Sequence, residues 1–67
     1  MKNELELSKE IYSFDNIIQT CEIYKEYAKI KVKSKIDKVV LTFTHCKYGC
    51  DITMKEFENY LINMENM

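Results

Sequence analysis

The sequence predicts an α+β domain in which a three-stranded antiparallel sheet, of strand order 1-3-2, carries two helices on one face. Three observations lead to this prediction. A run rich in β-branched residues fills 38–44, polar and apolar residues alternate at 4–7 and 29–33, and apolar residues recur with helical period at 14–28 and 54–64. The order of elements is therefore β-α-β-β-α, and we expect residues 1–67 to form a single small domain.

The run 38–44, Lys-Val-Val-Leu-Thr-Phe-Thr, is predicted to be the central strand, because β-branched, aliphatic and aromatic residues fill six consecutive places. Alternation along a strand divides these residues into a core face with Val39, Leu41 and Phe43 and an open face with Val40, Thr42 and Thr44. A strand with apolar residues on both faces suits the middle of a sheet.

The two alternating segments are predicted to be the strands on either side. In the first, Leu5 and Leu7 face the core, and in the second Ile30 and Val32 do so. Lys29, Lys31 and Lys33 face outward, as Lys does on edge strands that must not pair with other chains. Because the third strand forms a hairpin with the second, placing it between the other two makes every neighbour antiparallel.

The predicted helices have both periodicity and start signals. The apolar stripe of the first helix consists of Phe14, Ile17, Ile18, Cys21, Tyr24 and Ala28. Ser13 is placed to cap this helix. In the second helix, Thr53 and Glu56 have the spacing of a capping box, in which each side chain bonds a backbone amide of the first turn.

Composition limits the classes of function. Ten basic against eleven acidic residues give a net charge of −1, without the basic excess that phosphate neutralisation requires, so nucleic acid is an unlikely partner on charge alone. No apolar run approaches the roughly 20 residues that cross a bilayer, and nothing resembles a signal peptide, so we expect a cytoplasmic protein that does not enter a membrane. The three Cys are therefore expected as reduced thiols.

The chain from 5 to 64 resembles the small D proteins of the His-Xaa-Ser repeat systems (HxsD-like). The resemblance rests on Ile11-Tyr12-Ser13-Phe14, on Tyr24, Ala28, Ile30 and Val32, on Val39-Val40-Leu41, and on the segment Glu56 to Leu61. Such proteins are encoded beside radical S-adenosylmethionine enzymes that modify ribosomally made peptides. The resemblance implies a non-catalytic accessory protein that binds the modifying enzyme, its precursor peptide, or both, and it transfers no catalytic residue.

The loop 45–51 departs from the pattern of that family and suggests an alternative function. Zinc prefers four thiolate or imidazole ligands, and the Cys-x3-Cys spacing within this loop is compatible with such a site. The candidate ligands are Cys21, His45, Cys46 and Cys50. The competing and favoured interpretation is a buried Cys21 that packs as a small apolar residue beside a surface loop whose thiols bind nothing. Nucleophilic catalysis by adjacent His and Cys is disfavoured, since neighbours in sequence do not readily align.

The predicted partner-binding surface is the open face of the sheet together with its Lys-bearing edge. Its candidate residues are Lys29, Lys31, Lys33, Val40, Thr42 and Thr44. We expect either docking of a partner on the face, with a homodimer when the partner is absent, or addition of an acidic peptide strand at the edge. The five Tyr are interpreted first as core margin and surface, and second as interface anchors.

Overall fold

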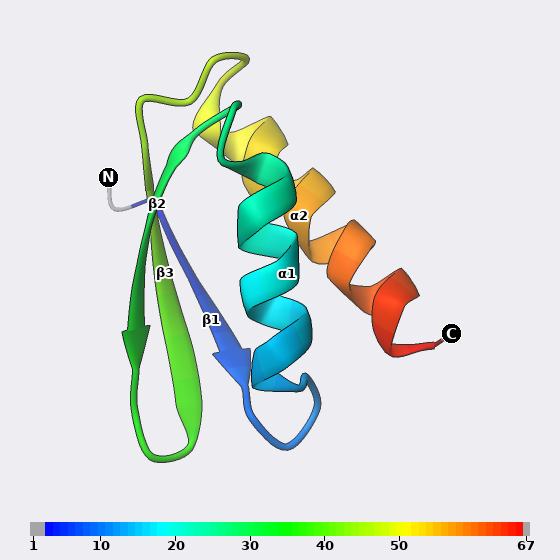
Figure 1. The fold of residues 1–67 in the computed structure, drawn as a ribbon. Helices are drawn as coiled ribbons and strands as arrows, with labels where there is room; N and C mark the ends of the chain where they lie inside the picture. The colour runs from blue at the N-terminus through cyan, green and yellow to red at the C-terminus, as the bar shows by residue number, and fades with distance from the viewer. Residues whose placement is uncertain (1–2, 67) are drawn as a thin grey trace.

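The computed structural model describes residues 3–66 and shows the predicted architecture (Figure 1). Its elements are β1 (Glu4–Ser8), α1 (Phe14–Tyr24), β2 (Lys29–Ser34), β3 (Lys38–Thr44) and α2 (Cys50–Glu65). The sheet order is β1-β3-β2 with antiparallel neighbours, and α1 and α2 lie on the same side of it. The prediction of a 1-3-2 sheet with two helices on one face is confirmed.

The central position of β3 fixes the core. Leu41 lies between Leu5 of β1 and Val32 of β2 in the register, and its side chain has no exposed surface. Burying apolar side chains of this size stabilises a fold by about 1.5 to 3 kcal/mol each. The core cluster joins β1 and β3 to both helices, and its members are Leu7, Ile17, Ala28, Val39, Leu41, Phe43, Phe57 and Leu61.

Helix α1 is shorter than predicted. It ends at Tyr24, because the backbone N–H groups of Tyr27 and Ala28 both donate to the carbonyl of Tyr24 and close a turn into β2. Ala28 is buried in the core as the stripe predicted, but it follows the helix instead of belonging to it. Periodicity alone did not reveal this turn.

The buried side of α1 is also rotated from the predicted stripe. Thr20 is buried, while Phe14 remains 41% exposed. The Thr20 hydroxyl lies 2.8 Å from the Asn16 carbonyl and 3.2 Å from the Met64 sulfur of α2, so the polar group is satisfied inside the helix pair. A threonine thus occupies the place where α1 faces α2.

The predicted capping box at Thr53 is wrong. Helix α2 begins at Cys50, one turn earlier, with Gly49 as its N-cap at φ 96°. Thr53 is therefore inside the helix and buried, and its hydroxyl donates to the Gly49 carbonyl at 2.9 Å. The positive φ of Gly49, which favours glycine, allows the loop to turn directly into the helix.

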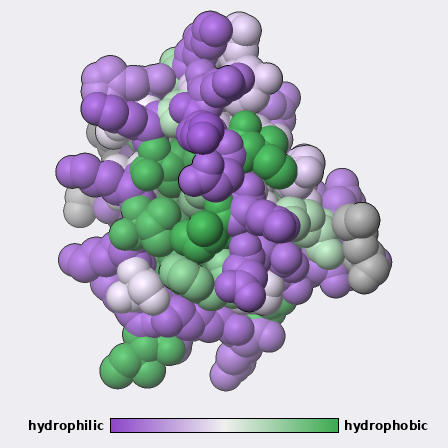
Figure 2. Space-filling view, in the orientation of Figure 1, coloured by the Kyte–Doolittle hydropathy of each residue, from purple (hydrophilic) through white to green (hydrophobic). Residues whose placement is uncertain are grey.

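The edge of the sheet is less covered than predicted. Val32 was expected to face inward but is 41% exposed, because it lies on β2, whose arrowhead end is far from both helices (Figure 1). Figure 2 shows hydrophobic groups between the sheet and α1, and another projecting at the end of the β2–β3 hairpin. Ile36 in that hairpin turn is 99% exposed. Within residues 3–66 no helix has the length and apolar character that crossing a membrane requires.

Candidate functional site

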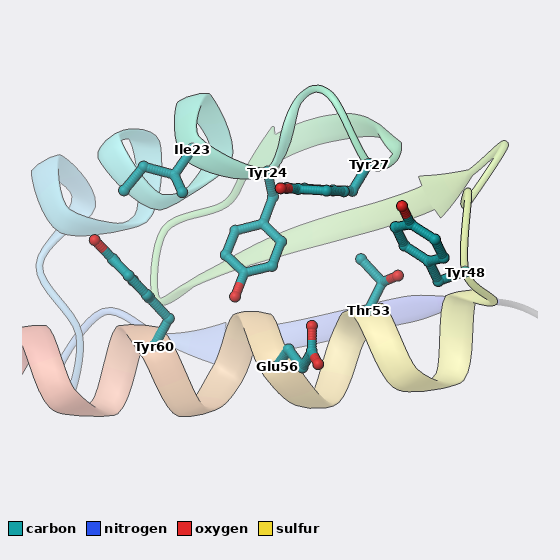
Figure 3. A pocket seen from close by; sticks show the side chains of 7 residues that line it. All are labelled: Ile23, Tyr24, Tyr27, Tyr48, Thr53, Glu56 and Tyr60. Carbon is teal, nitrogen blue, oxygen red and sulfur yellow. The ribbon is translucent and has the colours of Figure 1, made fainter.

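A pocket of about 430 Å³ lies between the end of α1 and α2, and tyrosines dominate its lining (Figure 3). Two of its walls come from the end of α1 and the following turn, and the others come from the loop before α2 and from α2 itself. The residues of this tyrosine pocket are Ile23, Tyr24, Tyr27, Tyr48, Thr53, Glu56 and Tyr60. Its volume falls within the range of roughly 300 to 1,000 Å³ found for small-molecule and side-chain sites.

The tyrosine rings form one connected row centred on Tyr24. The ring centroid of Tyr24 lies 6.0 Å from that of Tyr27 and 6.1 Å from that of Tyr60, and Tyr27 is in turn 6.1 Å from Tyr48. Tyr24 also packs on Phe57 at 5.6 Å, which connects the row to the hydrophobic core. The innermost ring is therefore held by the core, whereas the outer rings border the opening.

Glu56 is the one acidic side chain among the residues that line the tyrosine pocket. Figure 3 shows its carboxylate pointing from α2 toward the turn that carries Tyr27, between the rings of Tyr24 and Tyr48 in that view. Burial raises the pKa of Tyr24, and the nearby negative charge of Glu56 raises it further. The Tyr24 phenol consequently stays protonated at neutral pH and can donate a hydrogen bond.

The loop 45–49 positions Tyr48 at the mouth of the pocket. A disulfide joins Cys46 to Cys50 and encloses Tyr48 in a five-residue ring. The Lys47 backbone N–H donates to the Tyr27 carbonyl at 2.7 Å, which ties this loop to the turn after α1. The backbone hydrogen bond from Lys47 to Tyr27 thus holds Tyr27 and Tyr48 near one another, in addition to the contact between their rings.

The expectation of three reduced thiols is wrong for two of them, because Cys46 and Cys50 form this disulfide. Their spacing of four positions was interpreted as compatible with a metal, although it also suits a small covalent ring within a loop. Cys21 is the free cysteine of residues 3–66; partial burial, with a smaller effect from Glu22, raises the pKa of its thiol to about 11.

The four candidate zinc ligands are not brought together. The sulfurs of Cys46 and Cys50 are consumed by the disulfide, Cys21 lies on α1, and His45 is an exposed residue at φ 53°. Across residues 3–66 the structure contains no group of three His, Cys, Asp or Glu side chains arranged to hold a metal ion. The zinc alternative is therefore not retained.

The predicted sheet surface is only partly accessible. Lys29, Lys31, Lys33 and Thr44 are exposed and Thr42 is half-buried, but Val40 is only 7% exposed and does not form an open apolar centre. In the register Val40 lies between Glu6 and Lys33, and Glu6 forms an ion pair with Lys38 at 3.3 Å. Long side chains of this kind cover apolar surface with their stems. The open face is consequently polar and charged.

Sequence reasoning missed the tyrosine pocket, although part of its signal was present. Glu56 and Tyr60 are four residues apart and so share one side of a helix, as do Ile23 and Tyr27 in the first predicted helix. What was missing is the crossing of the two helices, which alone brings these sets together. No family model matches the chain, and no curated protein or solved structure matches it either.

Proposed function

We propose that this chain is a non-catalytic adaptor whose tyrosine pocket receives a side chain of a partner protein or peptide. The observation that carries the proposal is an open pocket of about 430 Å³ lined by Tyr24, Tyr27, Tyr48 and Tyr60. Tyrosine is one of the residue types that contribute most to binding at interfaces, because it buries a large surface with little loss of side-chain entropy.

The class of partner follows from the resemblance to HxsD-like proteins. It points to a radical S-adenosylmethionine enzyme of such a system, or to the precursor peptide of that enzyme. We place this binding in the cytoplasm, where a ribosomally made peptide meets the enzyme that modifies it, and the Cys46–Cys50 disulfide would then be of a kind that is rare in that compartment. A binding role also suits the chemistry of the pocket, whose lining offers phenol groups and one carboxylate, without His or Cys.

The tyrosine pocket is a better anchor for a partner than the predicted open face. An interface needs an apolar centre inside a polar rim, and Val40, which would supply that centre on the sheet, is buried. The pocket has both parts, with Tyr24 packed on Phe57 in its interior and exposed Tyr48 at its edge. The Lys residues of β2 remain available to interact with an acidic segment outside the pocket.

Co-purification with a radical S-adenosylmethionine enzyme encoded near this chain and with its precursor peptide, each expressed separately, tests the proposal. The variant Tyr27→Ser with Tyr48→Ser removes two exposed rings and spares the core. We expect it to lose at least about tenfold in affinity for the partner, as the removal of two interface anchors does. The matched control, Thr42→Lys with Thr44→Lys, changes the open sheet face and should bind like the parent.

Two results would contradict the proposal. If the control loses binding while the pocket variant keeps it, the interface lies on the sheet face. If the parent chain retains neither the enzyme nor the peptide, the adaptor role itself is wrong. Size-exclusion chromatography of the parent and control proteins alone would show whether the sheet face forms a homodimer.

A further inference from the structure

The charges around the tyrosine pocket are unbalanced. Glu56 is acidic, and none of the other lining side chains is Lys, Arg or His. The ion pairs formed within residues 3–66 are Lys25 with Glu22 and Lys38 with Glu6, so the Glu56 carboxylate has no cationic partner there. Glu56 is an exposed residue, so its carboxylate is available to a cationic ligand.

The rings around this carboxylate are also suited to a cation. The face of an aromatic ring carries partial negative charge and attracts a cation within about 6 Å of its centre. The ring of Tyr24 is tilted by 61° to that of Tyr27 and by 76° to that of Tyr60, so the rings present their faces and edges from different directions. Figure 3 shows Tyr27 with one ring face turned toward α2 and the Glu56 side chain.

Rings that are tilted to one another suit a compact ammonium group, because several of them can surround it, as in the aromatic cages that recognise quaternary ammonium groups and methyl-lysine. An ammonium group already contacts the rim, because the Nζ atom of Lys47 lies 5.9 Å from the ring centroid of Tyr48. Lys47 does not line the pocket itself, so the interior remains open to a second cation.

We infer that the tyrosine pocket binds an alkylammonium group, namely the terminal ammonium of a lysine side chain, unmodified or methylated, in the partner. This inference rests on the proposed adaptor function and specifies the chemistry of its ligand. The cation lies beside the Glu56 carboxylate, which neutralises its charge, and against the rings of Tyr24, Tyr27 and Tyr48. Tyr60 borders the pocket on the other side of Tyr24. The aliphatic stem of the ligand passes the apolar side chain of Ile23 at the border of the pocket.

Titration with tetramethylammonium chloride, followed by NMR of the tyrosine ring protons, tests this inference without any partner. We expect saturable shifts at the four pocket tyrosines and not at Tyr12, which packs against the core away from this pocket. Tert-butanol, which has a similar shape but no charge, should bind at least about threefold more weakly if cation attraction dominates. Sodium chloride at equal ionic strength controls for salt effects.

Two variants identify the groups responsible. Glu56→Gln keeps the shape of the side chain and removes its charge, and it should weaken tetramethylammonium binding by about threefold, as expected for an accessible ion pair. Glu58→Gln is the matched control, since it makes the same change on the same helix outside the tyrosine pocket, and it should have no effect. Tyr27→Leu keeps apolar bulk, removes the aromatic face, and should also weaken binding about threefold.

The inference is overturned if tert-butanol binds as tightly as tetramethylammonium, if neither saturates, or if Glu58→Gln weakens binding as much as Glu56→Gln. These results are independent of the co-purification experiment. If a partner binds at the tyrosine pocket but the protein does not bind tetramethylammonium, the ammonium ligand is refuted and the adaptor function stands. If the pocket binds tetramethylammonium but the chain binds no partner, only the adaptor role is refuted.

Discussion

Phe43 of β3 and Phe57 of α2 meet edge to face, with ring centroids 5.4 Å apart and ring planes at 85°, and neither side chain has exposed surface. Because this pair joins the central strand to α2, Phe43→Ala should leave a cavity between them. We expect a loss of about 3 to 5 kcal/mol in the free energy of unfolding, measured by urea denaturation. That loss is enough to unfold much of a small domain.

Phe14→Ala provides the matched control for this prediction, because it makes the same chemical change at a side chain that is 41% exposed. Phe14→Ala should lower the free energy of unfolding by well under half as much as Phe43→Ala does. Equal losses in the two variants would mean that Phe43 does not lie in the core.

The carboxylate of Glu65 at the end of α2 caps the start of α1. Its Oε1 atom accepts hydrogen bonds from the Ser13 backbone N–H and from the Asn16 side-chain amide, both at 2.8 Å. These bonds, that of Ser13 first, lower the pKa of Glu65 below its ordinary value of 4.5. A lowered pKa means that Glu65 stabilises the fold above pH of about 4.5 and that this contribution is lost as the pH falls through the folded-state pKa.

Melting temperature measured between pH 3 and 7 checks this pH dependence. The parent should be more stable than Glu65→Gln at pH 7, and the two curves should converge at the acid end, where Glu65 is neutral. Glu26→Gln removes an exposed carboxylate without such bonds and serves as the control for the loss of a carboxylate as such. A constant difference between the parent and Glu65→Gln at every pH would show that the charge of Glu65 contributes nothing.

The three cysteines should differ in their reactivity toward iodoacetamide. Cys46 and Cys50 are joined, and the thiol of Cys21, with a pKa of about 11, is almost entirely protonated at pH 8. Mass spectrometry of the folded, unreduced protein should therefore show one slow modification, at Cys21, and two further rapid ones after reduction. Two rapid modifications before any reductant is added would show that the disulfide is absent.

Gly49 should resist substitution because of its backbone conformation alone. Its φ is 96°, and nothing lies within 4 Å of the position that a Cβ atom would take. Gly49→Ala should therefore destabilise the protein by about 1 to 3 kcal/mol in urea denaturation, the usual cost of an unfavourable backbone conformation. Lys47→Ala, in the same loop but not at this conformation, should cost less than about 0.5 kcal/mol. Similar values for both variants would contradict the conformational explanation.

The parts of the fold that the sequence predicted are those that depend on residue type within one segment. The run 38–44 has the same bounds in the structure as in the prediction, because its β-branched residues have few alternatives to a strand. The start of the first helix at Phe14, with Ser13 as its N-cap, is confirmed, but the end of that helix and the start of the second were misplaced, because tertiary contacts decide them. Tyr24 begins a turn that periodicity does not encode, and the cap at Gly49 overrode the local signal at Thr53.

The candidate site was harder to predict for a related reason. Val40 was assigned to the correct face, but its burial depends on the strands on either side, which place Glu6 of β1 and Lys33 of β2 next to it in the register. The tyrosine pocket depends on four separate segments, and each contributes only one to three lining residues. No single stretch of sequence therefore carries its pattern, and only the packing of α1 on α2 creates it.

The Glu65 cap and the tyrosine pocket lie at opposite ends of the antiparallel helix pair. With 11 residues, α1 is about 16 Å long at 1.5 Å per residue, so the two ends are separated by roughly the length of that helix. At one end the Glu65 carboxylate accepts hydrogen bonds from Ser13 and Asn16, and at the other the Lys47 backbone N–H donates to the Tyr27 carbonyl. The helix pair is therefore held by polar bonds at both of its ends, and the walls of the pocket are anchored outside the hydrophobic core as well as by it.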